Sequence, residues 1–501
     1  MSWIGKQLGW LRIGAGGRAR GSTRFTFGFR PGKLAAAATT TTASRATFSS
    51  SINVESSSKN YEFTGEESKI TEALQKMIQN RQLDHEDGKS LAVVYDLDML
   101  EDLRVQLKAS MPNWLHTFAI KAAPFEFLLH DMVESGMGLE AASFLEVKMA
   151  EAAGCPGNKI VFDSPAKTVP EIKYALERGL LLNCNSLEEI GRVRRAYDSV
   201  NVHPSTRIGV RLNPMVGSGA VESLSVSTAD SKFGIINQEE VIEAFNQFPA
   251  LCGLHVHTGS QGMSVDQLAQ GVRSVTILAE KINRSCGKRI NTIDIGGGLS
   301  TNYESMEISP TFQEYSEALR RRVPELFDSD AFGGGVEIVT EFGRGLCAKA
   351  GWVATGVEYM MRGDPDKPVA ITHAGADLFV RPCYDPEHFG HRFSAYADNG
   401  TPLSQCAKQE KTYDIAGPLC FAGDVIGREV TLPTLDEGDW IVVHDCGANT
   451  FALWSRHCSR QAPPVFGISK RSKLAECSDD GVEVRVLKER ESPEDVMEFW
   501  R

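Results

Sequence analysis

Eight short apolar segments, most of them followed by a stretch long enough for a helix, constrain the fold of this 501-residue chain more than any other feature. The expected strands are 117–121, 138–142, 159–162, 180–184, 207–212, 253–257, 292–295 and 337–341. The expected helices between them include 169–178, 187–197, 238–248 and 265–284. This repeated alternation predicts a closed (β/α)8 barrel, with a doubly wound open sheet as the alternative.

Polar residues follow the apolar part of each expected strand. They are Lys121, Glu140, Asp163, Asn185, Arg211, His257, Gly296 and Glu341. The carboxyl ends of barrel strands open at one mouth, where active sites of this fold are built. We therefore expect these residues to meet in one site.

Beyond Arg344 the pattern changes to strands alone, expected at 353–361, 368–371, 412–416, 440–444 and 482–486, with a surface loop at 398–411. Pro and Gly separate these strands, which is typical of an all-β domain, and a strand expected at 91–96 joins it. The expected domains are a targeting segment at 1–55, a helix (66–78) and strand joining the β domain within 56–100, the barrel at 101–345, and the β domain at 346–501.

The first 54 residues carry eight basic residues and no acidic residue, since the first acid is Glu55. An Arg-rich, acid-poor segment is typical of import into an organelle. We expect the mitochondrion rather than a plastid, with cleavage near residues 48–50; a disordered tail is the alternative. Removing these eight from the 53 basic residues leaves 45 against 65 acidic residues, so the remaining chain would carry about −20.

The composition also argues against several partners. The net charge of −12, with no basic stripe in the body of the chain, argues against a nucleic-acid surface. No apolar run is long enough to span a membrane. The eleven cysteines show no CxxC spacing, which predicts reduced thiols rather than a disulfide framework or a zinc site.

Lys121 is the first candidate for chemistry, because it ends the apolar segment 117–121. An ammonium group at the end of a buried strand is costly unless its charge is used or removed. Condensation with an aldehyde to a Schiff base removes it. A structural lysine whose amine reaches solvent is the alternative.

Three further motifs follow later strands. The glycines at 296–298 could bring backbone N–H groups onto a phosphate, although glycines also make tight turns. Glu341 and Arg344 could form an ion pair, or could divide between a ring nitrogen and a phosphate. His255 and His257 alternate along one strand. No carboxylate or third histidine lies near them in sequence, so we expect no metal, and a ring stacked on a flat cofactor fits better.

The sequence resembles the fold-type III pyridoxal-phosphate decarboxylases, the group IV family of ornithine, lysine, arginine and diaminopimelate decarboxylases, and is most similar to the diaminopimelate branch. The matching stretches, in the family's order, are 94–96, 119–122, 160–162, 211–214, 231–235, 253–261, 294–298, 341–344 and 417–424. The resemblance implies an alanine-racemase-like (β/α)8 barrel that binds pyridoxal 5'-phosphate. It also implies a C-terminal all-β domain carrying the second half of the active site, and a homodimer with shared active sites.

The resemblance further implies decarboxylation of an amino acid, through a Schiff base on Lys121 and a quinonoid intermediate. Lys121, His257 and Cys420 would be catalytic, with Cys420 coming from the partner subunit to return a proton to Cα. Glu341 would keep the pyridine nitrogen protonated. The cofactor-binding residues would be Lys121, Arg211, His257, Ser260, Gly296, Gly297, Gly298, Glu341, Gly343, Arg344 and Asn449. The residues that bind the amino-acid substrate would be Arg344, Arg381, Tyr384, Asp385 and Phe421.

Several positions depart from the family. Phe421 stands where the diaminopimelate branch has a glutamate, Asn449 replaces a tyrosine that reaches the phosphate, and Glu140 replaces an aspartate. The segment 381–385 is one residue shorter than in that branch, and Asp385 could take over a distal amine. Since losing an acid beside a buried ammonium costs several kcal/mol, we expect a substrate other than diaminopimelate, with a conjugated or apolar distal group.

Two other functions on the same fold are alternatives. A non-catalytic regulator like the antizyme inhibitors would suit Phe421 and Asn449, but Lys121 and Cys420 argue against it. An amino-acid racemase is the other, and Glu341 argues against it because the related alanine racemases have an arginine there.

Overall fold

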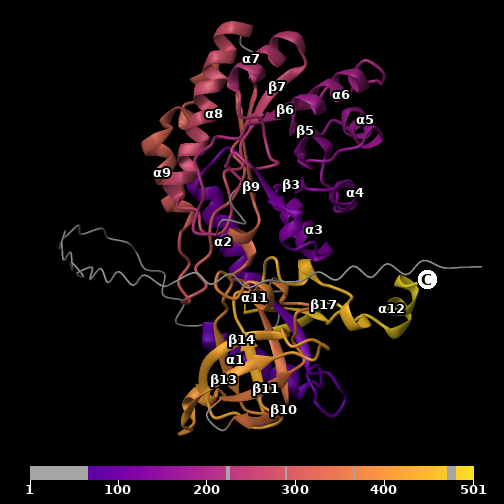
Figure 1. Cartoon of the computed structure of the whole chain (residues 1–501), viewed down its shortest axis with the longest axis vertical. Coiled ribbons are helices and arrows are strands. Elements are labelled where there is room, and N and C mark those ends of the chain that lie inside the picture. The colour runs from indigo at the N-terminus through magenta and orange to yellow at the C-terminus, as the bar shows by residue number, and fades with distance from the viewer. Residues whose placement is uncertain (1–65, 222–225, 288–289, 365–366, 471–480) are drawn as a thin grey trace, which may run out of the picture. The chain divides into compact units, whose positions relative to one another are not determined.

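The computed structural model describes residues 66–221, 226–287, 290–364, 367–470 and 481–501 (Figure 1). The described residues belong to one compact unit, which runs from Tyr61 to Arg501. The targeting segment expected at 1–55 lies outside them. Within the described ranges, no helix combines the length and the apolar composition needed to cross a bilayer.

Eight parallel strands close into a barrel, as the sequence predicted (Figure 1). They are β2 (Leu115–Ala119), β3 (Gly138–Ala141), β4 (Ile160–Phe162), β5 (Leu181–Cys184), β6 (Arg207–Arg211), β7 (Leu251–His255), β8 (Thr292–Asp294) and β9 (Glu337–Phe342). Each strand pairs with the next, and β9 returns to β2 with Thr117 opposite Glu341. This closure excludes the doubly wound open sheet.

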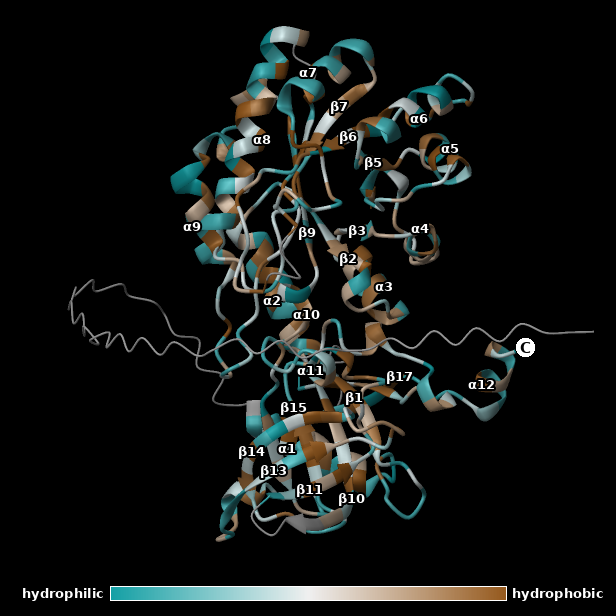
Figure 2. Cartoon of the chain, viewed as in Figure 1, coloured by the Kyte–Doolittle hydropathy of each residue, from teal (hydrophilic) through white to brown (hydrophobic). Residues whose placement is uncertain are grey.

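Helices cover the barrel; the first precedes the first barrel strand, and each of the others lies between two successive strands. They are α2 (Leu97–Ser110), α3 (Glu126–Glu134), α4 (Phe144–Ala152), α5 (Val169–Arg178), α6 (Leu187–Tyr197), α7 (Gln238–Gln247), α8 (Val265–Cys286) and α9 (Phe312–Arg322). In α8, a capping box of Ser264 and Gln267 starts the helix and Gly287, at φ 77°, ends it. Its buried residues recur at helical spacing from Leu268 to Ile282. Figure 2 shows hydrophobic barrel strands and helices that also carry hydrophilic residues.

The remaining strands form a nine-stranded sheet. They are β1 (Leu91–Asp96), β10 (Gly351–Asp364), β11 (Lys367–Thr372), β12 (Phe393–Tyr396), β13 (Glu410–Ala416), β14 (Val425–Pro433), β15 (Trp440–Val443), β16 (Val465–Ser469) and β17 (Glu483–Lys488). β1 pairs with β10 and β16, so the early strand is part of the β domain. Its helices are α1 (Glu66–Gln79), α11 (Val380–Tyr384) and α12 (Pro493–Phe499), whereas α10 (Arg344–Cys347) directly follows β9 and contacts α2 of the barrel. Leu74 of α1 packs in one core with Trp352 and Trp440.

Three strands of this sheet, β12, β14 and β16, are absent from the strands expected from sequence. In β14 the alternation of apolar and polar residues is broken, because Glu429 adopts a positive φ of 53° and the pairing with β13 shifts register. The expected loop 398–411 is wrong at its end, since Glu410 and Lys411 already pair with β14. Both side chains are exposed and charged, so the apolar pattern of the sequence did not indicate that the strand begins there.

Two barrel strands end two residues earlier than the apolar pattern indicated. β2 ends at Ala119, and Lys121 lies in the 3-10 helix η1 (Ile120–Ala122). β7 ends at His255, which leaves His257 in the following loop. Ile120 and Val256 are fully buried although they lie outside the strands. The apolar pattern therefore identified which residues are buried, but it did not identify where the paired strands end.

Segment 447–449 is bonded both to β1 of its own domain and to the barrel. The Tyr95 hydroxyl donates to the carbonyl of Gly447 at 2.8 Å, and the N–H of Asn449 donates to the carbonyl of Ala122 at 2.8 Å. A Cβ atom on Gly447 would lie 1.7 Å from the carbonyl oxygen of Cys347, so a glycine is required. These contacts hold segment 447–449 against the turn that carries Lys121.

Candidate active site

Lys121 and Glu140 form an ion pair at the carboxyl ends of β2 and β3. Glu140 pairs with Ala119 across the two strands, and Lys121 follows two residues later. The Lys121 ammonium group donates to Glu140 Oε2. The Glu140 side chain is 0% exposed, whereas the Lys121 side chain is 47% exposed. A fully buried carboxylate therefore meets an amine that a ligand can reach.

The charges around this pair shift both pKa values upward. Burial raises the pKa of the Glu140 carboxyl to about 7, and the charges of Glu341 and Asp163 add to this rise while Lys121 opposes it. Loss of water contact opposes the charge of Lys121, but Glu140, Glu341 and Asp163 together raise the pKa of its ammonium group. Unbonded Lys121 is therefore an ammonium at neutral pH.

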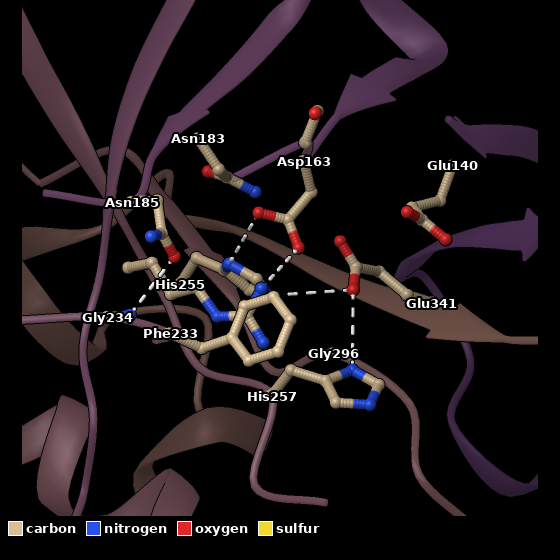
Figure 3. Close-up of polar contacts among 12 residues, drawn as sticks. Glu140, Asp163, Asn183, Asn185, Phe233, Gly234, His255, His257, Gly296 and Glu341 are labelled. Atoms are coloured by element: carbon tan, nitrogen blue, oxygen red, sulfur yellow. Dashed lines mark hydrogen bonds and ion pairs between the residues drawn. The ribbon is translucent and has the colours of Figure 1, made fainter. Parts of the chain in front are cut away.

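His255, the last residue of β7, lies between two carboxylates (Figure 3). Its Nδ1 is 3.5 Å from Asp163 Oδ1 and its Nε2 is 3.4 Å from Glu341 Oε2. Arg211 Nη1 donates to the other oxygen of Asp163 at 3.0 Å. Burial opposes the charge of His255, but Asp163, Glu341 and Asp294 outweigh it and raise the pKa of the imidazole to about 9. His255 is therefore a cation at neutral pH.

Glu341, on β9, is an ionised acceptor without a donor. Burial would raise the pKa of its carboxyl, but the charges of His255 and Lys121 hold it well below its usual range. Neither carboxylate oxygen accepts a hydrogen bond from any described residue. A buried acceptor of this kind needs a donor, which a ligand N–H can supply.

The glycine turn 296–298 lies directly after β8. Gly296 and Gly298 have φ values of 67° and 91°, and a Cβ atom on Gly297 would lie 2.2 Å from the carbonyl oxygen of Glu341. A turn without side chains lets backbone N–H groups approach an anion closely. The N–H of Gly297 donates to His257 Nδ1 at 3.3 Å, and burial lowers the pKa of this histidine. The His257 ring is therefore neutral, and its 3.7 Å approach to Glu341 is not a salt bridge.

Two arginines border a cavity of about 20 Å³, which Tyr303 and Asn449 also line. Arg344 donates to the Tyr303 hydroxyl at 3.0 Å and to Ser260 Oγ at 3.4 Å. Arg344 Nε and Arg381 Nη1 are buried and have no hydrogen-bond partner among the described residues. Burial and the charge of Arg344 lower the pKa of Arg381 to about 10. Unused guanidinium donors of this kind are suited to anions.

Cys420 and Phe421 belong to a separate group in the turn before β14. The carboxylate of Asp424 shapes this turn by accepting two backbone N–H groups, both at 2.6 Å. Cys420 is exposed, and the Phe421 ring stacks on Tyr384 with centroids 5.9 Å apart. Within the described residues, no hydrogen bond or ion pair joins Cys420 or Phe421 to Lys121.

Two of the expected ligand-binding residues are already engaged within the chain. Arg211 contacts Asp163, and its guanidinium carbon lies 4.4 Å from the centroid of the Phe233 ring. Asp385 Oδ1 is 2.7 Å from His388 Nδ1, and this contact raises the pKa of the histidine. Both residues therefore have protein partners, and their roles toward a ligand stay predictions.

Sequence reasoning assigned no role to Asp294 or Tyr303 and only a disfavoured metal role to His255. Asp294 accepts hydrogen bonds from Asn183 Nδ2 at 3.1 Å and from the N–H of Gly296 at 3.0 Å. Burial and the charge of Glu341 raise the pKa of Asp294 well above its ordinary value. The sequence offered one signal for His255 and Asp294: each is an ionisable residue in a buried strand, β7 and β8 respectively.

The argument from sequence spacing against a metal was incomplete. Asp163, His255 and Glu341 come from three strands, and they offer ligand atoms within 4.8 Å of one another. Arg211 already supplies positive charge to Asp163. The charges therefore favour an ion-pair network at this position.

These residues fit pyridoxal phosphate. Glu341 offers an unsatisfied carboxylate for a pyridinium N–H, and Arg344, Ser260 and the turn 296–298 offer donors for a phosphate. His257 offers a neutral flat ring, and Lys121 an amine for the aldehyde. The unpartnered buried atoms of Glu341 and Arg344 support this fit most directly.

Comparison with known proteins decides the family. Residues 97–348 match the family model of the pyridoxal-binding domain of pyridoxal-dependent decarboxylases. The chain belongs to the pyridoxal-dependent decarboxylases. It is therefore a pyridoxal-phosphate-dependent carboxy-lyase that acts on an amino acid.

Relatives of this decarboxylase agree with that assignment. The diaminopimelate decarboxylase of Helicobacter pylori is 26% identical, covering 81% of this chain and 94% of the relative. The enzyme of the same name from Pseudomonas fluorescens is 29% identical, covering 73% and 86%. Both are decarboxylases, which favours that reaction over racemisation or a purely regulatory role.

Solved structures share the fold of this decarboxylase. Diaminopimelate decarboxylase from Helicobacter pylori complexed with L-lysine superposes with a TM-score of 0.70 at 23% identity, covering 83% of this chain and 99% of that one. Lysine/ornithine decarboxylase from Vibrio vulnificus complexed with putrescine gives 0.62 at 19% identity, covering 76% and 95%. At these identities the likeness shows the barrel and β domain only.

We expect His255→Asn to remove a pH-dependent part of the stability of this decarboxylase. The folded-state pKa of about 9 exceeds the ordinary value of 6.5, so the imidazolium stabilises the fold fully below pH 6.5 and this contribution is lost as the pH rises through 9. The shift corresponds to on the order of 3 kcal/mol. Urea unfolding at about pH 6 and about pH 10 should show a deficit of the variant that is large at the lower pH and small at the higher. The exposed His203→Asn is the control, and an equal deficit at both pH values would contradict the assignment.

Proposed function

We propose that this decarboxylase binds its cofactor through Lys121 and acts on an amino acid whose distal end carries a carboxylate but no ammonium group. The observation that carries the first part is the meeting, in one barrel mouth, of the reachable Lys121 amine with the unsatisfied carboxylate of Glu341. The second part rests on Arg381 and Phe421.

The residues of the barrel divide the work of holding the cofactor. Lys121 would hold the aldehyde covalently, Glu341 would accept the pyridinium N–H, and His257 would hold the face of the ring. Arg344, with Ser260 and the turn 296–298, binds the phosphate. When bound, pyridoxal phosphate supplies an electron-withdrawing ring that accepts the electron pair released as CO2 departs. Because Glu341 is ionised, it keeps the ring nitrogen protonated and so strengthens this electron sink.

Cys420 delivers the proton that replaces CO2 on Cα, and it does so in the active site of a partner subunit. The turn held by Asp424 presents an exposed thiol. No contact joins that thiol to Lys121 among the described residues of one chain, which is expected if two copies share each site. The functional unit is then a homodimer in which each mouth receives the 417–424 turn of the other copy.

Arg381 and the stacked rings of Phe421 and Tyr384 contact the distal end of the substrate and determine which group it can carry. The Nη1 atom of Arg381, which is buried and unpartnered among the described residues, is suited to a carboxylate. Phe421, stacked on Tyr384, provides an apolar surface that cannot hold an ammonium group. The carboxylate of Asp385 is already paired with His388 and so is less available to a distal amine. Diaminopimelate carries a distal ammonium as well as a carboxylate, so the amino acid lacking that amine, 2-aminopimelate, suits these side chains better.

Replacing Lys121 by alanine should abolish cofactor attachment and CO2 release. Purified wild-type protein with pyridoxal phosphate should absorb at ~420 nm, the band of a protonated imine with lysine, and Lys121→Ala should lack it. Lys159→Ala, which removes a half-buried lysine bonded to the carbonyl of Gly136, is the control and should keep the band. A Lys121→Ala variant that retains both the band and CO2 release would refute the assignment. Wild-type protein that stays colourless with the cofactor would favour a regulator.

Mixing two inactive variants tests the shared site. Lys121→Ala and Cys420→Ala homodimers should each show little CO2 release. After subunit exchange half of the dimers are mixed and each has one intact site, so about a quarter of wild-type activity should return. Each variant exchanged with itself is the control. No recovery despite exchange demonstrated by mass would contradict a site built from both subunits.

Restoring an acid at position 421 should restore recognition of a distal amine. We expect Phe421→Glu to raise the ratio of kcat/KM for diaminopimelate to that for 2-aminopimelate by roughly 10–100-fold, since the ammonium gains a partner and the apolar surface is lost. Phe421→Leu keeps the surface apolar and should leave the preference unchanged. The measurement is initial CO2 release with each amino acid. Wild-type protein that already prefers diaminopimelate would refute the proposed substrate class.

A further inference from the structure

We propose that Glu140 is the docking site of the Lys121 ammonium group whenever Lys121 is not bonded to the cofactor. This inference rests on the proposed role of Lys121 in binding the cofactor. It makes Glu140 a positioning residue, because it acts on the cofactor through Lys121. From the sequence we assigned Glu140 no role toward Lys121. We noted only that Glu140 lies at the mouth of the barrel and stands where the family has an aspartate.

The geometry provides one acceptor for the amine among the acids that surround it. β2 lies between β3, which carries Glu140, and β9, which carries Glu341. The Lys121 ammonium group bonds to Glu140 Oε2, whereas Glu341 acts on it only through its charge. The free amine is therefore drawn to the β3 side of the turn, and Glu341 remains available to the ring nitrogen of the cofactor.

The length of the Glu140 side chain matters for this contact. Ala119 lies opposite Glu140, so Lys121 is two residues beyond the pairing position and its amine must be met by a side chain that extends toward it. An aspartate at position 140 would withdraw the carboxylate by about 1.5 Å, the length of one carbon–carbon bond. The docking contact thus depends on a glutamate at position 140, where the family that this sequence resembles has an aspartate.

The charges of the two residues depend on each other. The charged groups that act on Glu140 are Lys121 from the turn after β2, Glu341 from β9 and Asp163 from the end of β4. Glu140 is fully buried and its Oε1 has no hydrogen-bond donor among the described residues, so only Lys121 offsets the two neighbouring acids. The rise in the pKa of Glu140 to about 7 reflects this shortage of positive charge.

A docked ammonium has a chemical consequence. A protonated amine has no lone pair, so Lys121 held by Glu140 neither attacks a carbonyl carbon nor removes a proton from Cα. To bond with the cofactor aldehyde, Lys121 must first lose one proton, and the nearest acceptor is Glu140 Oε2, which becomes a carboxylic acid as the amine becomes neutral. The reverse transfer restores the ion pair when Lys121 is released.

The test measures the reactivity of Lys121 directly. Full-length protein freed of cofactor is treated with acetic anhydride at a series of pH values, and acetylation of Lys121 is followed by mass spectrometry. Loss of the opposite charge in Glu140→Gln should lower the apparent pKa of Lys121 by about one unit or more, and so raise its acetylation at a fixed lower pH by about tenfold. The rate at which added pyridoxal phosphate forms the imine band should shift to lower pH in parallel.

Two further variants complete the experiment. Glu146→Gln is the matched control, because Glu146 is a nearby acid on α4 that bonds to the N–H of Ala142 and not to Lys121. Its profile should match the wild type. Glu140→Asp keeps the charge at a greater distance and should be intermediate, which gives a second variant if Glu140→Gln does not fold.

The outcomes separate this inference from the proposed function. If Glu140→Gln or folded Glu140→Asp gives the wild-type pH profile of Lys121 acetylation, the docking role is overturned, even though Lys121→Ala abolishes the imine band. If Lys121→Ala retains the band, the proposed function fails first. A shift that Glu146→Gln reproduces equally would also overturn the docking role, because it would reflect general charge rather than contact.

Discussion

Every part of the site depends on the balance of charge inside the barrel mouth. Three buried carboxylates, Glu140, Asp163 and Glu341, are brought together by strands that are distant in sequence. Water cannot screen them there, so each needs a cation nearby. Lys121, Arg211 and His255 supply these cations. The arrangement that lets the fold tolerate three acids therefore also keeps Lys121 charged. It leaves Glu341 without a hydrogen-bond donor among the described residues, so that this carboxylate is available to the ring nitrogen of the cofactor.

The barrel and the order of its site residues could be predicted from the sequence, because both follow from local patterns. Each strand is a short apolar segment, and each polar residue that follows it must lie at the mouth once the strands run parallel. The prediction placed Lys121 and His257 inside strands, where they do not lie. Buried Ile120 and Val256 continue the apolar pattern beyond the last paired residue, so hydrophobicity alone could not locate the ends.

The pairings within the site could not be predicted, because they join residues from strands that are not neighbours in sequence or depend on how side chains pack. The contact of His255 with Asp163 and Glu341 exists only once the barrel is closed. Likewise, the engagement of Asp385 by His388 and the isolation of Arg381 Nη1 depend on how α11 packs. In the β domain, the irregular backbone at Glu429 interrupted the alternation on which recognition of β14 would have relied. The family resemblance named the residues of the site but could not supply these partners.

The hydrogen bond from Asn449 to the carbonyl of Ala122 gives the β domain a part in the site even within one chain. The turn that orients Lys121 is braced from outside the barrel, by a segment more than three hundred residues away in sequence. A fragment cut after β9 would keep all eight barrel strands but lose this brace. Grafting the barrel onto a different β domain would require segment 447–449 to be carried along with it, so the two domains constrain each other's evolution at this one peptide.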